Sequence, residues 1–454
     1  SKMSDIVTEA IESGALGFST SRTILHRDVH GVYVPGTEAS SEEMKSLAFA
    51  IDKAGEGTLE IVSDWLDKEI EMSWMREYVE KSDCGLTVLQ TSGDAVKTIL
   101  FCEEQFLKGK NVRPQFPGRN VGMMFGLESS LHPFIGHPSY REIADLPLSE
   151  RVKIMKDPAF KEKLLNEKPN FASEIEKSMN EQGNTKSQEE IKEAANLGLK
   201  LISNYDTQFI LGDPPNYEPG KEDSIAALAK SKGIAELEVI YDEFLKNEGT
   251  NLVYACFTPY DNHKLDFVER AYSLKSSVAG GSDGGAHCGL ICDASMPTTN
   301  LSHWARDREA GKKIPIELIV RKQTKDTAET YGLFDRGEIK TGMLADLNII
   351  DFEKLNVTHP KMVYDLPLGG RRLIQTSSGY LATVKSGEVV YEAGEATGVL
   401  PGKLIRGKQT CEVKTEKERV PFIDRTLRLM SVKAFKLLWN FRKSSVKTTV
   451  VSDD

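Results

Sequence analysis

Residues 58–90 read TLEIVSDWLDKEIEMSWMREYVEKSDCGLTVLQ, and they contain the repeating unit of this chain. The stretch begins with the short β-rich run TLEIV (58–62) and ends with a second run, LTVLQ (86–90). Between the two runs, residues 67–80 have the apolar spacing of an amphipathic helix. Two strands separated by a helix predict a parallel βαβ unit, because parallel strands need a long crossover connection.

The same alternation extends in both directions along the chain. Further strands are predicted at 14–19, 112–116, 199–203, 251–257 and 277–281, and further helices at 41–54, 94–106, 224–231, 236–247 and 265–272. Many consecutive βα units favour either a closed (β/α) barrel or a doubly wound parallel sheet.

Three segments depart from this rhythm. Residues 144–198 are charged and largely helical in pattern, which predicts an insertion within a barrel domain spanning 1–335. Residues 336–407 contain short β-rich runs at 337–340, 345–351, 372–375, 380–384 and 388–391, separated by glycine turns. They predict a small antiparallel β domain. Residues 408–454 read as a charged linker followed by a basic amphipathic tail, with a helix candidate at 424–443.

Composition excludes several classes of protein. The 454 residues carry a net charge of −10, which disfavours a sequence-independent nucleic-acid binder. No apolar run approaches the ~18 residues that a membrane-spanning helix needs. Six scattered cysteines do not form a disulfide framework, and the first residues lack a signal peptide, so we expect a cytoplasmic protein. The chain starts inside a predicted helix, so its natural start can lie upstream.

Polar residues follow almost every predicted strand. They are Ser19, Ser21, Arg22, Asp64, Gln90, Arg119, Tyr260, Asn262, Asp283 and His287. In barrels and open α/β sheets the reacting groups lie at the carboxyl ends of the strands, so this pattern predicts an active-site mouth. Arg22 and Arg119 can each clamp a carboxylate, although a surface ion pair is the commoner role of arginine.

The sharpest motif is SDGGAHC (282–288). Asp283 can act as a general base, as a ligand to a metal that activates water, or as the cap of a following helix. His287 is either a site residue or a hydrogen-bonded loop histidine. The Cys288 and Cys292 thiols lack a second pair at zinc-finger spacing, which argues against structural zinc.

Other signatures are absent from the sequence. It has no His-x-His pair at a strand end, no Gly-x-Gly-x-x-Gly, no phosphate-binding loop and no Gly-x-Ser-x-Gly elbow. Residues 425–447 contain seven basic and no acidic residues among many apolar ones. We expect such a segment to pack on its own domain or to form a partly disordered tail. The alternative is contact with an anionic membrane or a partner.

Several longer motifs carry a resemblance to a known family. They are GALGFSTSRT, GRNVG, LHPF, HPSYREIADLP, LGDPPNYEP, SDGGAHCGLICDAS, GLFDRGEIKTGMLADLNIIDF, LPLGGRRL and GVLPGKLIRG. In these motifs, over most of residues 5–407, the chain resembles the amidohydrolases that include N-acyl-D-amino-acid deacylases. The resemblance implies a (β/α)8 metal-dependent hydrolase barrel with a small β domain. It also implies hydrolysis of carbon–nitrogen bonds in linear amides, with zinc or another divalent metal as cofactor.

The resemblance assigns residues by position. Asp283 matches the catalytic aspartate of the family and is also a metal-ligand candidate together with Asp64, whereas Ser19, Arg22, Arg119, Tyr260 and His287 are our candidates for contacts with a small-molecule substrate. The chain departs from the family because the strand with His-x-His is missing, and Gln90 stands where a metal-binding histidine is expected. We therefore predict an N-terminally incomplete barrel. The alternative function is a catalytically inactive homologue that acts as a binding module, tethered by its tail.

Overall fold

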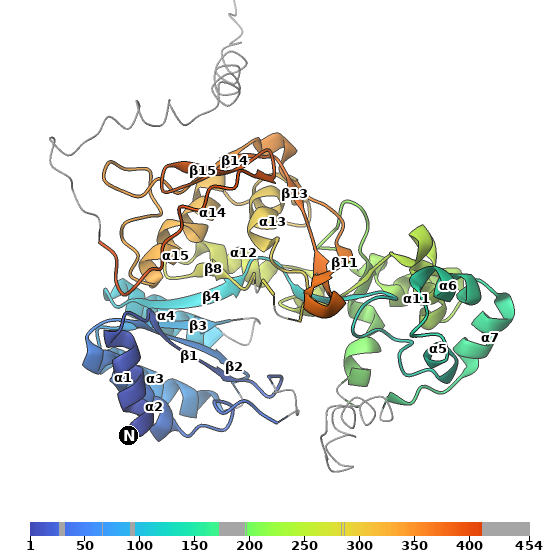
Figure 1. The fold of residues 1–454 in the computed structure, drawn as a ribbon. Coiled ribbons are helices and arrows are strands. Elements are labelled where there is room, and N and C mark those ends of the chain that lie inside the picture. The colour runs from blue at the N-terminus through green and yellow to red at the C-terminus, as the bar shows by residue number, and fades with distance from the viewer. Residues whose placement is uncertain are drawn as a thin grey trace, which may run out of the picture.

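The fold is that of a computed structural model of residues 1–454 (Figure 1). It describes residues 1–26, 32–65, 67–90, 96–171, 196, 198–282, 284–285 and 287–410. The predicted helix at 424–443 and the rest of the tail from residue 411 lie outside this part, as does the functional candidate Asp283.

Five parallel strands form the central sheet. They are β1 (Gly17–Arg22), β2 (Thr58–Ser63), β3 (Gly85–Leu89), β4 (Val112–Pro117) and β8 (Val278–Gly280), in the order β1-β2-β3-β4-β8. The strands predicted around residues 58–116 are therefore confirmed, together with their parallel direction. Because all five run the same way, their carboxyl ends share one edge, and β1 and β8 are the two edge strands (Figure 1).

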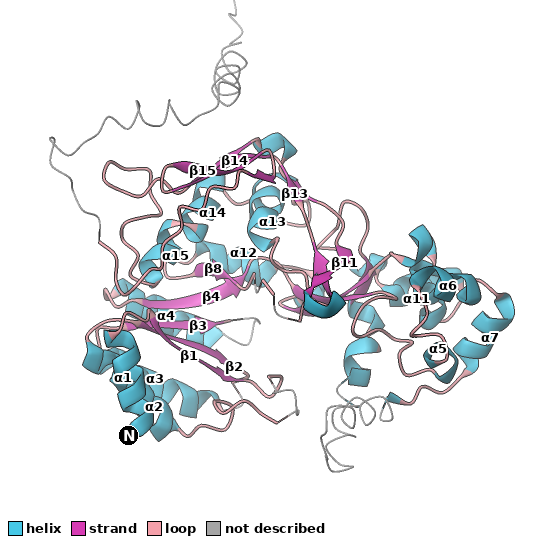
Figure 2. Ribbon diagram, in the orientation of Figure 1, coloured by secondary structure: helices cyan, strands magenta, loops and turns pink. Residues whose placement is uncertain are grey.

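Four helices cover one face of this sheet (Figure 2). They are α1 (Lys2–Glu12), α2 (Ser41–Ala54), α3 (Lys68–Lys81) and α4 (Val96–Leu107). Alternate strand residues such as Leu59, Ile61 and Val88 point toward these helices and are fully buried. The alternate apolar residues of the strands therefore pack against the apolar faces of the helices and form the first hydrophobic core.

The opposite face of the sheet is polar. The Gln115 amide nitrogen donates to Glu60 Oε1 at 2.9 Å, and the Tyr331 hydroxyl donates to Glu60 Oε2 at 3.1 Å. Thr87 lies between the two strands that carry Glu60 and Gln115. This face therefore holds hydrogen-bonded groups where a packed barrel would hold branched hydrocarbon side chains.

A second lobe packs around a small antiparallel sheet. This sheet has the order β5-β7-β6, with β5 (Val121–Phe125), β6 (Gln208–Ile210) and β7 (Val253–Thr258). Its helices are α5 (Pro138–Arg141), α6 (Leu148–Met155), α7 (Pro158–Asn166), α10 (Ile225–Lys232) and α11 (Glu236–Phe244). Helices α6 and α7 lie in the segment predicted as a helical insertion, whereas residues 172–195 lie outside the described chain.

Two predictions for this lobe are wrong. The strand at 251–257 exists as β7, but it runs antiparallel to both neighbours instead of continuing the parallel series. Residues 199–203 were expected to form a strand, but residues 198–202 are helical. The Ser203 hydroxyl donates to the Leu199 carbonyl oxygen at 2.6 Å, a contact four residues back along the chain that suits a helix.

The remaining elements connect the sheet to a group of small antiparallel sheets. The helices are α12 (Asp266–Ser273), α13 (Met296–Ser302), a π-helix (His303–Asp307), α14 (Ile316–Gln323) and α15 (Lys325–Thr330). The strands are β9 (Leu347–Ile350), β10 (Asn356–Val357), β11 (Lys361–Leu366), β12 (Gly370–Ile374), β13 (Ser377–Ser378), β14 (Tyr380–Lys385), β15 (Glu388–Glu392) and β16 (Glu395–Ala396). Short 3₁₀ segments lie at Tyr205–Thr207, Lys221–Asp223, Lys246–Gly249, Asp261–His263, Phe352–Lys354 and Pro367–Gly369.

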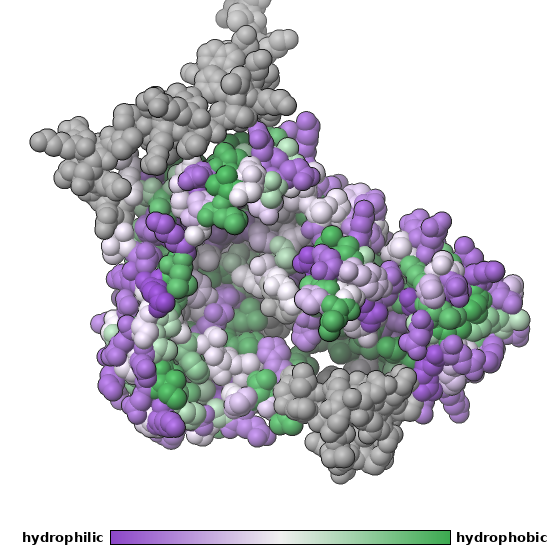
Figure 3. All heavy atoms as spheres, in the orientation of Figure 1, coloured by the Kyte–Doolittle hydropathy of each residue, from purple (hydrophilic) through white to green (hydrophobic). Residues whose placement is uncertain are grey.

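The predicted fold class is confirmed as α/β with one parallel sheet and small antiparallel β units. The described strands leave the parallel sheet open, and residues 337–340 form a bend and irregular backbone instead of the expected strand. The domain boundaries after residues 335 and 407 stay predictions. Hydrophilic residues dominate the face in Figure 3, with hydrophobic ones in scattered patches. Within the described chain, no helix is long and apolar enough to cross a membrane.

Candidate active site

The carboxyl edge of the parallel sheet gathers the predicted polar residues of four strands. Asp64 follows β2, Gln90 follows β3 and Arg119 follows β4. In register, Gly280 of β8 lies beside Pro117 of β4, so the SDGGAHC motif starts next to the loop that carries Arg119. These strand ends form one continuous edge, which is where open α/β sheets bind their ligands.

The loop after β1 folds over the ends of β1 and β2. The backbone N–H of Ile24 donates to Asp64 Oδ2 at 2.8 Å, and the Ser21 hydroxyl lies 2.7 Å from His26 Nδ1. Asp64, a predicted metal ligand, therefore already accepts a hydrogen bond from this loop. Ser19, a predicted substrate contact, is exposed on β1, separated from β8 by three intervening strands.

Arg22 joins β1 to α3 and to the loop before α2. Its Nε lies 2.6 Å from Glu71 Oε1, and the two side chains are 10% and 8% exposed. Its Nη1 donates to the Ala39 carbonyl oxygen at 2.8 Å, and Glu71 also accepts a hydrogen bond from Trp74 Nε1 at 3.0 Å. Arg22 thus cross-links the helical layer, and its assignment as a substrate contact stays a prediction.

Arg119 is completely buried. Its Nη2 forms an ion pair with Asp293 Oδ1 at 3.1 Å and donates to the Cys292 carbonyl oxygen at 3.0 Å. The guanidinium carbon lies 3.6 Å from the centre of the Tyr217 ring. Burial opposes ionisation, but Tyr217 and Asp293 outweigh it and raise the pKa of Arg119. A substrate carboxylate can reach this cation only after these contacts open.

Tyr260 also makes an internal contact. Residue Thr258, at the end of β7, pairs with Val121, so the antiparallel sheet delivers Tyr260 close to the loop after β4. The Tyr260 side chain is buried, and its hydroxyl donates to the Pro219 carbonyl oxygen. Burial raises the pKa of this hydroxyl far above its ordinary value, so it stays protonated.

A buried charge network lies beside this position. Glu218 Oε2 lies 2.7 Å from His303 Nε2 and 3.0 Å from Arg308 Nε, and Arg308 also contacts Glu269. Burial raises the pKa of Glu218, but the hydrogen bonds from His303 and Arg308 outweigh it and set the pKa at about 2. Sequence reasoning missed this network. Glu218 lies in the quoted motif LGDPPNYEP, but 85 residues separate it from His303.

The SDGGAHC loop leaves β8 with an abrupt change of direction. Gly281 has φ +77°, and His287 has φ +45° with an exposed side chain. The His287 carbonyl oxygen accepts from the backbone N–H of Leu290 at 2.7 Å, which closes the loop as a turn. Asp283 lies outside the described residues, so its role and that of His287 stay predictions.

The described side chains at this edge do not provide the ligands that the expected metal needs. In the described ranges, no group of three or more His, Cys, Asp or Glu side chains can hold a metal ion. The Gln90 side chain at the end of β3 is 1% exposed, its two polar atoms have no hydrogen-bond partner among the described residues, and an amide is a weak ligand for zinc. The described residues therefore do not form the metal site that the resemblance implies.

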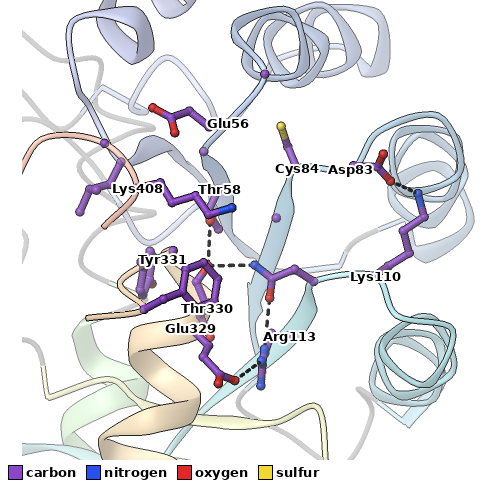
Figure 4. A pocket seen from close by; sticks show the side chains of 18 of the residues that line it. Glu56, Thr58, Asp83, Cys84, Lys110, Arg113, Glu329, Thr330, Tyr331 and Lys408 are labelled. Atoms are coloured by element: carbon purple, nitrogen blue, oxygen red, sulfur yellow. Dashed lines mark hydrogen bonds and ion pairs between the residues drawn. The ribbon is translucent and has the colours of Figure 1, made fainter. Parts of the chain in front are cut away.

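A cavity lies at the opposite, amino edge of the sheet (Figure 4). It has a volume of about 830 Å³, and Thr58, Gly85, Arg113 and Tyr331 are among the residues that line it. None of the predicted site residues lines it. Because reacting groups in such sheets gather at the carboxyl edge, this cavity is not the candidate active site.

Comparisons with solved structures find D-aminoacylases. One, studied for the role of its binuclear metal centre, is 16% identical to this chain, with 87% of this chain and 64% of that chain covered and a TM-score of 0.46. A second, which defines a novel subset of amidohydrolases, is 17% identical with the same coverage and a TM-score of 0.44. A D-aminoacylase mutant in complex with copper chloride is 16% identical, also with 87% and 64% coverage, and has a TM-score of 0.45.

The chain thus spans 64% of the length of the solved structures that it matches. No curated protein sequence matches it. The profile of the amidohydrolase family matches residues 1–391, which is most of the 454-residue chain. With its parallel sheet and the polar carboxyl edge described above, the chain belongs to the amidohydrolase family.

Proposed function

We propose that this chain hydrolyses the carbon–nitrogen bond of a linear amide, with an N-acyl amino acid as the small-molecule substrate class. Membership in the amidohydrolase family supports a hydrolase. The observation that carries the proposal is the shared carboxyl edge of β2, β3, β4 and β8, because the SDGGAHC loop starts there beside the loop after β4.

Asp283 is the proposed proton shuttle of the reaction. Its carboxylate takes a proton from the water that attacks the amide carbonyl carbon. It then delivers that proton to the leaving nitrogen as the carbon–nitrogen bond breaks, which yields a carboxylic acid and an amine. No step is assigned to a metal, because the described donors at this edge do not form a metal site.

The candidates for substrate contacts differ in how available they are. Ser19 and His287 are exposed, so a ligand can meet them without any rearrangement. Arg22, Arg119 and Tyr260 are held by Glu71, Asp293 and the Pro219 carbonyl oxygen. We propose that these three residues mainly shape the edge and that His287, which lies in the same loop as Asp283, contacts the substrate. Ser19 is separated from that loop by three strands, so its contact with substrate stays a prediction.

A binding module without turnover is the second candidate function. It is favoured by Gln90, a neutral amide that lies buried at the end of β3 where a metal-binding histidine is expected. Such a protein would bind N-acyl amino acids at the carboxyl edge and release them unchanged.

One experiment separates the two functions. The full chain is incubated with a panel of N-acetyl-D-amino and N-acetyl-L-amino acids, and free amine is measured, while calorimetry measures binding. Hydrolysis that disappears in Asp283→Asn but persists in the exposed control Asp206→Asn supports the enzyme. Binding without release of amine supports the binding module, and neither binding nor turnover contradicts both.

A further inference from the structure

The cavity at the amino edge of the parallel sheet belongs to a different part of the molecule from the candidate active site. Its floor is built where the last turn of α15 meets the strand starts. Both Thr58 Oγ1, at 2.9 Å, and Asn111 Nδ2, at 3.0 Å, donate to the Thr330 carbonyl oxygen. Phe106 and Phe334 add apolar surface to its wall, and Phe334 is 41% exposed. The cavity therefore offers apolar contacts at a position where catalysis is not expected.

The cavity wall carries more acidic than basic residues: Asp52, Glu56, Asp83 and Glu329 against Lys110, Arg113 and Lys408. Lys408 Nζ lies 5.2 Å from the centre of the Phe334 ring. Two of its basic residues are already paired with acids: Lys110 Nζ lies 2.8 Å from Asp83 Oδ1, and Arg113 pairs with Glu329 at 3.5 Å (Figure 4). Two further carboxylates that line it, Asp52 and Glu56, form no ion pair within the described ranges of the chain. An occupant with both cationic and apolar groups matches this wall.

Cys84 lines the same wall, and its thiol lies 3.9 Å from the Ile51 carbonyl oxygen. Burial raises the pKa of its thiol, the carboxylates of Asp52, Asp83 and Glu56 raise it further, and the Ser82 hydroxyl opposes them. Because the half-buried thiol of Cys84 lines the cavity, its reactivity reports on whatever fills the cavity.

The end of the described chain leaves from the rim of this cavity. Gly407 and Lys408 line the wall, and the backbone N–H of Gly407 donates to the Gly14 carbonyl oxygen at 2.8 Å. Gln409 is held by two backbone hydrogen bonds of 2.9 Å, one to Gly332 and one from Phe334. The residues after 410 therefore start beside the cavity.

The sequence after the rim contains basic and aromatic residues, which complement the acidic and apolar groups of the wall. Residues 425–447 contain seven basic and no acidic residues, with the aromatic residues Phe435, Trp439 and Phe441 among them. The 14 residues 411–424 reach about 46 Å when extended, which is ample for a return to the cavity. A short tether also gives the segment an effective concentration in the millimolar range.

We infer that the amino-edge cavity is a docking site for the basic segment 425–447 of the same chain. Aromatic side chains of the segment fill the apolar part of the cavity, and its lysines and arginines face Asp52 and Glu56. The docked segment occupies this cavity and leaves the carboxyl edge free for substrate.

Thiol labelling of Cys84 tests this inference. The full chain and a chain that ends at Thr410 are treated with iodoacetamide, a small neutral reagent, and labelling at each cysteine is followed by mass spectrometry. A docked segment slows labelling because the thiol reacts only when the cavity opens. We expect Cys84 to react at least about tenfold faster in the shortened chain. Cys288, which contacts the Arg371 carbonyl oxygen outside this cavity, should react equally in both.

A second pair of variants keeps the full length of the chain. Lys433→Glu with Lys436→Glu reverses two charges in the docking segment, whereas Lys414→Glu with Lys417→Glu reverses two charges in the tether. The first pair should expose Cys84 and the second should leave it protected. Equal labelling of Cys84 in all chains would overturn the inference. Protection that rises with protein concentration would overturn it in favour of a second copy. Binding to anionic phospholipid vesicles with unchanged Cys84 labelling would overturn it in favour of a membrane surface.

Discussion

Arg119 and Asp293 form an ion pair from which water is fully excluded, with Nη2 and Oδ1 3.1 Å apart and both side chains 0% exposed. The pair joins the loop after β4 to the segment that precedes α13, 174 residues further along the chain. Tyr217 stacks on the guanidinium from the second lobe. One cation therefore fastens three segments at the carboxyl edge of the parallel sheet.

Replacing this cation should destabilise the fold. Arg119→Met removes the cation that faces the buried carboxylate of Asp293, a loss that costs about 3–5 kcal/mol. Arg119→Lys keeps the charge but loses the flat stack on Tyr217, so its cost should be intermediate. Denaturant unfolding measures both variants. If Arg119→Met unfolds at the same denaturant concentration as the natural chain and only raises KM, then Arg119 is a substrate contact and not a structural one.

The Glu218 network predicts a stability change in acid. The carboxyl has a pKa of about 2 in the folded chain and an ordinary value of 4.5. Its contribution is therefore complete above pH 4.5 and is lost as the pH falls from 4.5 toward 2. Glu218→Gln should lower the unfolding free energy near neutral pH by about 3 kcal/mol and flatten its decrease in that acid range.

The exposed neighbour Glu222 supplies the matched control. Glu222→Gln should leave both the stability and its pH dependence unchanged. If the unfolding free energy fell equally steeply between pH 4.5 and pH 2 in Glu218→Gln and in the unchanged chain, the low pKa could not belong to Glu218.

Gly118 occupies a position without space for a side chain. A Cβ atom there would lie 1.8 Å from Asn300 Oδ1, and the Gly118 carbonyl oxygen accepts from Trp304 Nε1 at 2.6 Å. Gly118→Ala should therefore cost about 1–3 kcal/mol through overpacking. Gly402→Ala, where a Cβ meets nothing within 4 Å, is the control. Thermal unfolding compares the two, and equal melting temperatures would show that the Asn300 side chain can move aside.

The sequence predicts the parallel sheet well because its signals are local. In residues 58–90, alternating strand runs flank an amphipathic helix, and each run becomes a strand of the expected direction. Helix α2 begins after the Ser40 cap and ends before Gly55, which has φ +82°, and these are the ends that the apolar spacing predicts. Periodicity and caps act within a few residues, so they can be read without the rest of the molecule.

Direction and distant contacts are not local. Residues 253–256 are all buried, and a continuous apolar run favours a parallel strand because such strands are covered on both faces. Here, β7 is buried inside an antiparallel sheet, so the strand was predicted correctly and its direction was not. Likewise, the sequence shows that Arg22 and Arg119 follow strands, but it does not show their ion-pair partners. Glu71 and Asp293 lie 49 and 174 residues away.

Turnover by the full chain and by Asp283→Asn decides whether the carboxyl edge of the parallel sheet hydrolyses an amide through Asp283. Amine release from N-acetyl-amino acids is measured for both, together with unfolding curves that show whether the fold is unchanged. We expect measurable release by the full chain and a loss of at least about 10²-fold in the variant, which is the range for removal of a general acid–base. Release that proceeds at the same rate without the carboxylate would contradict this role of Asp283.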